Sequence, residues 1–330
     1  MTTEETQLER TIRSQPEELR RILTSGEVQA QVHATAQGLH RAHRIWLVGT
    51  GTSQHAAELG AAMLQEAGRA AQAIPSMHFV EWAPIVGPQD GVIVITHTAE
   101  SAFALAARAA VFAAGLGVMM ICRRGTGFPD AIETVDRETS ETYTTSYTAT
   151  LTVLAMLAQQ LGAQSFAPDT LTDLPEAVAA AIDGPGIDGV PADARVTVFA
   201  GAGPASVTAR EGALKAREAA RVLAEGYDVE YLLHGMAVPL GAGDHLVTLT
   251  PPDAGGFLTD VGNAARAQGL GVTDLHEPWP LPPMLAQIPL TVRLQMLALR
   301  LAKERGHDPD KVIAGAWESS ELWAHGRPIA

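Results

Sequence analysis

Short apolar runs alternate along the chain with longer segments that have helical periodicity. In the first half such runs occupy residues 44–48, 92–95 and 117–122, and in the second half 196–200, 245–250 and 270–275. Most are followed by a turn of small or polar residues and then by an Ala- and Leu-rich helical segment. This order predicts buried strands joined by helices, as in parallel βαβ units.

One pattern, a strand followed by a Gly-x-Gly turn and a helix, occurs twice. The two copies begin about 150 residues apart. The two turns are Gly49-Thr50-Gly51 and Gly201-Ala202-Gly203. The sequence therefore predicts an α/β fold of two tandem doubly wound, flavodoxin-like parallel-sheet lobes. The helices expected between strands span residues 54–67, 145–161, 207–223 and 285–305. Two further helices are expected in residues 7–42, separated by Pro16.

Five regions follow from this reading. Residues 1–43 form the N-terminal helices, 44–165 the first lobe and 195–305 the second lobe. A linker rich in Pro, Gly and Asp is expected at 166–194, and a tail at 306–330.

Composition narrows the classes of function. The 330 residues are 46% hydrophobic and 18% charged, which is typical of a globular protein with a buried core. A net charge of −14 argues against a nucleic-acid partner, because phosphate backbones are bound by clustered Lys and Arg. The single Cys122 excludes an intramolecular disulfide, and the 11 histidines include no closely spaced pair. No metal or cofactor is expected, nor a membrane span or a secretion signal, so we expect a cytoplasmic protein.

Two hydroxyl-rich turns follow predicted strands. The first, Gly49-Thr50-Gly51-Thr52-Ser53, lacks the G-x-G-x-x-G spacing of dinucleotide folds and suits a compact phosphate better than a pyrophosphate. It can also be read as a tight turn with Ser53 as the helix N-cap. The second turn is Thr96-His97-Thr98-Ala99-Glu100-Ser101. Since ligands of parallel sheets bind beyond the carboxyl ends of the strands, both turns are candidate phosphate sites.

The helix at 207–223 carries a candidate catalytic group. Glu211, Lys215 and Glu218 are spaced i, i+4 and i+7, so they share one helix face. A carboxylate on such a face can act as a general base in proton transfer, and a neighbouring lysine and a distant histidine can assist it. The competing interpretation is a solvated helix face with an ordinary ion pair.

These segments resemble the double-SIS (sugar isomerase) family, which includes the isomerase domain of glucosamine-6-phosphate synthase and stand-alone SIS-type glucosamine-6-phosphate deaminases. The likeness rests on Gly51-Thr52-Ser53, on the 96–101 turn where the family has Ser-Gln-Ser-Gly-Glu-Thr, and on the segment from Glu211 to Glu218. It extends through Ala224-Glu225-Gly226-Tyr227 and His234-Gly235.

The resemblance implies a sugar phosphate as ligand, no cofactor and a homodimer. It assigns Glu218 as the proton-transfer base, His234 as the ring-opening residue and Lys215 as their electrostatic partner. The phosphate-binding residues it implies are Gly51, Thr52, Ser53, Thr96, His97, Thr98, Ser101, Thr144 and Thr145.

Departures from the family pattern are concentrated at the phosphate turn and the C-terminus. Ala99 stands where the family has Gly and adopts positive φ less readily, while His97 could bind phosphate when protonated or hydrogen-bond locally. The family's Ser-Thr-Lys run reads Tyr143-Thr144-Thr145.

In the tail, Lys311 comes too early to match the family's substrate lysine, so imine chemistry is not expected. The tail could supply other ligand contacts, but Trp317 and Trp323 are expected to dock it on the core. Arg123 and Arg124 follow a predicted strand and could clamp an anion, but adjacent loop residues seldom face the same site, so a solvated loop is expected.

We expect a phosphosugar-processing enzyme, either an aldose–ketose isomerase or an amino-sugar-phosphate deaminase. Because no glutaminase domain precedes the matched segments, glutamine-driven synthesis is not expected. Two alternatives remain: a non-catalytic sugar-phosphate-binding module that acts as a sensor or regulatory subunit, and an enzyme whose substrate no longer carries phosphate.

Overall fold

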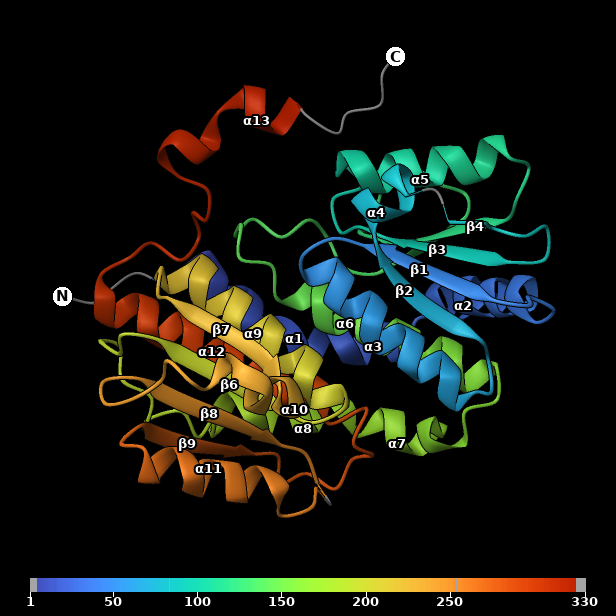
Figure 1. Cartoon of the computed structure of the whole chain (residues 1–330). Coiled ribbons are helices and arrows are strands. Elements are labelled where there is room, and N and C mark those ends of the chain that lie inside the picture. The colour runs from blue at the N-terminus through green and yellow to red at the C-terminus, as the bar shows by residue number, and fades with distance from the viewer. Residues whose placement is uncertain (1–4, 83, 253, 325–330) are drawn as a thin grey trace. The chain divides into compact units, whose positions relative to one another are not determined.

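The computed structural model describes residues 5–82, 84–252 and 254–324 (Figure 1). The chain forms two compact units, each built on its own sheet. The first unit comprises Glu17–Glu138, Thr145–Asp173 and Ile313–Ala330, and the second Met1–Pro16, Thr139–Thr144 and Leu174–Val312. The units therefore do not follow the continuous ranges expected from the sequence.

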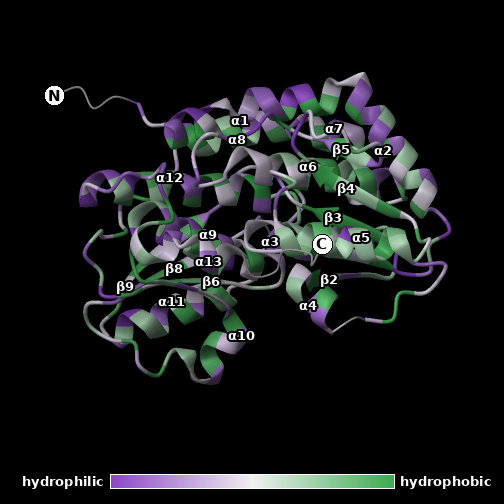
Figure 2. Ribbon diagram, turned by 90° about the horizontal axis from the view of Figure 1, so that it is seen from above, coloured by the Kyte–Doolittle hydropathy of each residue, from purple (hydrophilic) through white to green (hydrophobic). Residues whose placement is uncertain are grey.

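The first unit contains a parallel five-stranded sheet in the order β2-β1-β3-β4-β5. Its strands are β1 (Ile45–Gly49), β2 (Ala71–Pro75), β3 (Gly91–Ile95), β4 (Val118–Cys122) and β5 (Ala131–Glu133). Every residue of β1 and β3 is buried, which explains their continuous apolar runs, and Figure 2 shows β3 and β4 as hydrophobic ribbon. The order is that of flavodoxin-like sheets.

Helices cover both faces of this sheet. The helix α5 lies on one face, and α2, α3 and α6 lie on the other (Figure 1). The helices of this unit, apart from α1, are α2 (Gly26–Leu39), α3 (Thr52–Glu66), α4 (Ser76–Glu81), α5 (Ala102–Ala113), α6 (Thr145–Gln160), α7 (Pro168–Thr172) and α13 (Ser320–Ala324), with short 3-10 turns η1 (Gln164–Phe166) and η3 (Gly315–Glu318).

The second unit repeats the plan with four parallel strands in the order β7-β6-β8-β9. They are β6 (Thr197–Gly201), β7 (Ala224–Asp228), β8 (His245–Thr250) and β9 (Gly271–His276). The helices α9 and α11 cover opposite faces, and α12 packs against both α9 and α8. The helical elements are α8 (Leu174–Asp183), α9 (Pro204–Ala220), α10 (Val229–Tyr231), η2 (Leu232–Met236), α11 (Phe257–Ala267) and α12 (Gln287–Arg305). The prediction of two doubly wound parallel sheets is confirmed.

The Gly-x-Gly turns of the two units have the same backbone conformation. Gly51 has φ 55° and ψ −130°, and Gly203 has φ 55° and ψ −127°, a region that only glycine enters readily. A Cβ on Gly49 would stand 2.4 Å from the carbonyl oxygen of Ser53, and the equivalent Gly201 is equally crowded. Both turns therefore need glycine at both positions.

A buried aspartate fixes the start of the central strands in each unit. The Asp90 carboxylate accepts from Arg44 at 3.0 Å and from the Gly87 N–H at 3.0 Å, and so ties β1 to the turn before β3. The same arrangement in the second unit joins Arg195, Asp244 and Gly241. The duplication seen in the sequence thus extends to side-chain contacts.

The first helix passes through the position where we expected a break. Helix α1 (Gln7–Thr24) continues across Pro16, which deprives the Ile12 carbonyl of its usual N–H donor. The side-chain amide of Gln15 donates to that carbonyl instead, at 3.2 Å. The break lies at Ser25, whose hydroxyl accepts from the Val28 N–H at 3.3 Å and caps α2.

The expected linker and tail contain ordered elements. Residues 166–194 include α7 and α8, and α8 buries Leu174, Val178 and Ile182 along one face. At the start of the tail, the Asp310 carboxylate accepts from the N–H groups of Gln7 and Leu8, at 2.8 and 2.7 Å, and caps α1.

Docking of the tail through Trp317 is not observed, because 74% of that side chain is exposed. The side chain of Trp323 lies outside the described residues.

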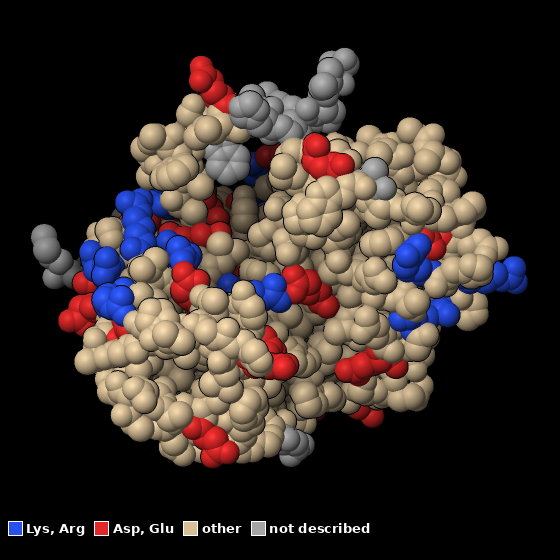
Figure 3. Space-filling model, in the orientation of Figure 1, with Lys and Arg blue, Asp and Glu red and all other residues tan. Residues whose placement is uncertain are grey.

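On the face drawn in Figure 3, most of the surface is uncharged. Many basic atoms gather toward the left of this view, with acidic atoms beside them. Exposed ion pairs such as Arg217–Glu225 neutralise charge locally. No helix in the described part of the chain is both long and apolar enough to cross a membrane.

Candidate active site

Two of the predicted phosphate turns lie on neighbouring strands of the first unit. Since β1 and β3 are paired and parallel, their carboxyl ends carry Gly51-Thr52-Ser53 and the 96–101 turn at the same sheet edge. Gly51 is the N-cap of α3, and no side chain caps this helix. The alternative in which Ser53 is the N-cap is therefore wrong: the N-cap is Gly51 and the helix begins at Thr52, two residues before the Gln54 start that a Ser53 cap implies.

The 96–101 turn is held by its own hydroxyl groups. Thr96 is 2% exposed and donates to the Ser101 hydroxyl at 3.4 Å, and the Glu100 N–H donates to the Thr98 hydroxyl at 3.2 Å. Ala99 has φ 57°, so it adopts the left-handed conformation in spite of its Cβ. The turn thus has positive φ at the position where the sequence pattern of the SIS family has glycine. Backbone outliers of this kind are concentrated at ligand sites.

His97 makes the local hydrogen bond that was one of its two expected roles. Its Nε2 accepts from the backbone N–H of Glu138 at 3.1 Å, so that nitrogen carries no proton. Burial lowers the pKa of His97, and the positive charges of Arg123 and Arg137 lower it further. The Glu138 carboxylate acts in the opposite direction without reversing the shift. We therefore treat His97 as neutral near pH 7.

Glu138 was not singled out from the sequence, although it organises the start of α6. This carboxylate is 8% exposed and accepts from the N–H groups of Thr145 and Ser146, at 3.2 and 2.8 Å. It therefore occupies the positive end of the helix dipole. Thr145 is the first residue of α6, whereas Thr144 is fully buried in the second unit and donates its hydroxyl to Thr11 at 3.2 Å. A glutamate several residues before a helix has no sequence signature that marks it as a cap.

The predicted catalytic residues of α9 form a buried charge cluster in the second unit. Lys215 is fully buried, and its Nζ lies 2.5 Å from Glu218 Oε2 and 3.6 Å from Glu211 Oε1. Glu211 is also fully buried, whereas 20% of the Glu218 side chain is exposed. The interpretation of a solvated helix face is therefore wrong, because Glu211 and Lys215 are buried in a helix that packs against α12. Among the three, Glu218 is the group within reach of a ligand.

Among the described residues, no hydrogen bond or ion pair joins His234 to this cluster. It is exposed in the turn after α10, and its Nδ1 lies 2.8 Å from the Glu230 carbonyl oxygen. The turn depends on Gly235, which has φ 121°. The described contacts of His234 are thus within its own turn.

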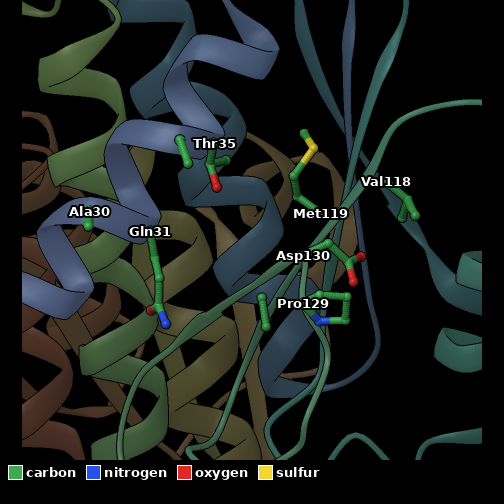
Figure 4. Close-up of a pocket in the computed structure, with 9 residues that line it drawn as sticks. Ala30, Gln31, Thr35, Val118, Met119, Pro129 and Asp130 are labelled. Carbon is green, nitrogen blue, oxygen red and sulfur yellow. The ribbon is translucent and has the colours of Figure 1, made fainter.

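A separate cavity in the first unit contains none of the predicted site residues. It has a volume of about 460 Å³ and lies between α2, which contributes Gln31 and Thr35, and the strand residue Met119 (Figure 4). The Gln31 side chain already accepts from the Glu133 N–H at 2.9 Å. Within the described residues, no group of three or more His, Cys, Asp or Glu is placed to hold a metal ion.

Comparison with known proteins identifies the fold of the first unit. Residues 38–160 match the family model of the SIS domain. This stretch is a SIS domain. The match begins at the end of α2 and runs to the end of α6, so it includes both predicted phosphate turns of the SIS domain.

Curated relatives extend the likeness beyond the SIS domain. A glutamine–fructose-6-phosphate aminotransferase (isomerizing) from Pyrococcus horikoshii is 30% identical over 309 residues, covering 84% of this chain and 51% of that protein. A protein of the same name from Thermococcus kodakarensis is 29% identical over 321 residues, covering 85% of this chain and 52% of that protein. The chain thus spans about half the length of these relatives. The resemblance to SIS proteins is confirmed.

Solved structures share the fold over nearly the whole chain. Glucosamine-6-phosphate deaminase from Thermotoga maritima superposes with a TM-score of 0.78 at 17% identity, covering 92% of this chain and 97% of that chain. The C-terminal domain of glucosamine-fructose-6-phosphate aminotransferase from Francisella tularensis gives 0.77 at 20% identity, covering 93% and 98%.

Proposed function

We propose that this protein processes a sugar phosphate, as an aldose–ketose isomerase or an amino-sugar-phosphate deaminase that moves a proton between C1 and C2. Glu218 is the base, Lys215 is its electrostatic partner, and His234 assists ring opening. The SIS-domain turns Gly51-Thr52-Ser53 and 96–101 bind the phosphate. We further propose a cytoplasmic homodimer, which light scattering and cell fractionation would test.

The buried Glu211–Lys215–Glu218 cluster is the observation that carries the proposal. Burying three charges costs free energy, even where they pair, and structural packing alone would be served as well by apolar residues. Of the two carboxylates only Glu218 reaches solvent, and its Oε2 lies 2.5 Å from the Lys215 ammonium, which fixes the direction of this carboxylate. Positioned bases of this kind typically contribute about 10²- to 10⁴-fold to a rate.

Replacement of Glu218 by Gln tests the catalytic role. The first step is a thermal-shift panel of hexose and amino-hexose 6-phosphates and their unphosphorylated parents, since a bound ligand raises the melting temperature. Any hit is then assayed for ketose formation and for ammonia release. We expect Glu218→Gln to lose at least about 100-fold in turnover while sugar-phosphate binding is retained. Glu304→Gln, an exposed glutamate of α12 that pairs with Arg300, is the matched control and should leave turnover unchanged. Full turnover in Glu218→Gln would contradict the assignment.

A non-catalytic sugar-phosphate sensor is the second candidate. It is favoured by His234, which is exposed and bonded within its own turn rather than to the α9 cluster. Selective stabilisation by sugar phosphates without ketose formation or ammonia release would support this candidate. If neutral sugars stabilise the protein as well as their phosphates do, the substrate has diverged from phosphosugars.

A further inference from the structure

The two adjacent arginines after β4 have different surroundings. Arg124 forms a two-pronged ion pair with Asp136, with its Nε 2.9 Å from Oδ1 and its Nη2 2.6 Å from Oδ2. The side chains of Arg124 and Asp136 are 39% and 77% exposed. Arg124 is therefore the solvated loop residue that the sequence suggests, and its charge is neutralised.

Arg123 lies instead against the phosphate turn. Its backbone N–H donates to the His97 carbonyl at 2.9 Å, which ties the end of β4 to the 96–101 turn. Its half-buried side chain donates from Nη1 to the Arg124 carbonyl at 2.9 Å. Within the described residues it makes no ion pair, and its Nε is buried without an acceptor. The edge formed by Nε and Nη2 thus lacks a protein partner.

The other charges around this turn are already compensated. Glu100 pairs with Arg137 through two contacts of 2.6 and 3.0 Å. Glu138 accepts from the first N–H groups of α6, as described above. Arg123 therefore differs from the other charged residues beside the turn: within the described residues, no carboxylate forms an ion pair with it. Holding a partly buried guanidinium without an anion costs free energy, so the site is more favourable once an anion is bound.

We propose that Arg123 binds the phosphate group of the substrate, together with the hydroxyls and backbone N–H groups of the 96–101 turn. The inference rests on the proposed function and extends it by naming a cationic residue for phosphate recognition. A guanidinium suits this role because its planar edge donates two parallel hydrogen bonds to phosphate oxygens. Neutral His97 cannot supply the charge.

The test compares Arg123→Met with Arg124→Met in the full chain. Binding of fructose 6-phosphate, inorganic phosphate and fructose is measured by calorimetry at fixed ionic strength. A hydrogen-bonded charge of this kind corresponds to a loss of about 10- to 100-fold in affinity for both phosphate compounds. Arg124→Met should bind both as the wild type does, and Arg123→Lys should recover part of the affinity because it restores the charge but not the fork.

Each outcome decides between the inference and the proposed function. If the wild type binds fructose 6-phosphate and Arg123→Met binds it equally well, the inference is wrong and the proposed function stands. If the wild type binds neither inorganic phosphate nor any hexose or amino-hexose 6-phosphate of the thermal-shift panel, both fail.

A second measurement needs no substitution and remains decisive if Arg123→Met does not fold. Phenylglyoxal modifies accessible arginines, and mass spectrometry reports the extent at each site. Fructose 6-phosphate should slow modification of Arg123 and leave Arg124 unchanged. Equal modification of Arg123 with and without the sugar phosphate would overturn the proposal.

Discussion

The left-handed conformation of Ala99 gives a stability prediction with an unusual sign. Replacing alanine by glycine normally destabilises a protein, by roughly 0.5–1 kcal/mol, because glycine loses more backbone entropy on folding. At Ala99, however, φ is 57°, where a Cβ costs about 1–2 kcal/mol. The difference predicts that Ala99→Gly stabilises the protein by roughly 0.5–1 kcal/mol.

The matched control is Ala109→Gly in the same unit. Ala109 is exposed in the interior of α5, so glycine there should destabilise by about 1 kcal/mol. Urea unfolding followed by circular dichroism measures both variants, and the midpoints are compared at unchanged slope. The midpoints should move in opposite directions. If Ala99→Gly destabilises the protein as much as Ala109→Gly does, the argument that Ala99 is strained is wrong.

Two further predictions concern buried charges. Lys215→Met should lower the free energy of unfolding by about 3 kcal/mol or more, since it leaves two carboxylates facing each other without a cation. Lys303→Met, which removes a partly exposed ion pair with Glu9, should change it by less than about 1 kcal/mol in the same urea titration, and equal effects would contradict the buried cluster. Burial alone would raise the pKa of Asp90. Hydrogen bonds from the Gly87 N–H, the Trp46 indole and Arg44 bring that pKa below its usual value. Its contribution to stability is therefore complete above pH 4 or so and is lost as pH falls through the lowered pKa, so Asp90→Asn should flatten the acid limb of a stability–pH curve.

The sequence predicted the central strands well because burial gives them continuous apolar runs. The runs at 44–48, 92–95 and 245–250 coincide with β1, β3 and β8 to within one residue at either end. Three strands were not predicted, namely β2, β5 and β7. β2 and β7 lie at sheet edges and have partly exposed, polar or Pro-ending sequences, and β5 has only three residues. Such strands form because a neighbour supplies the pairing, and local composition does not record that.

For the candidate site, spacing identified the shared face of Glu211, Lys215 and Glu218, but not its burial. Covering that face depends on α12, more than 60 residues later in the chain. The cap formed by Glu138 and the positive φ of Ala99 are likewise tertiary effects. Glutamate is not a typical cap so far from its helix, and alanine is not a typical left-handed residue. The sequence could not predict the different surroundings of Arg123 and Arg124, because the two are consecutive residues of the same type.

The duplicated aspartate contacts have a consequence for how this sequence can change. Asp90 is 6% exposed and Asp244 is fully buried, so removing either arginine partner would leave a negative charge inside the protein. A single substitution at either position is therefore expected to be harmful, whereas simultaneous replacement of both partners by neutral residues can be tolerated. Among homologous sequences, position 44 should accordingly co-vary with position 90, and position 195 with position 244, while the two pairs are free to diverge from each other.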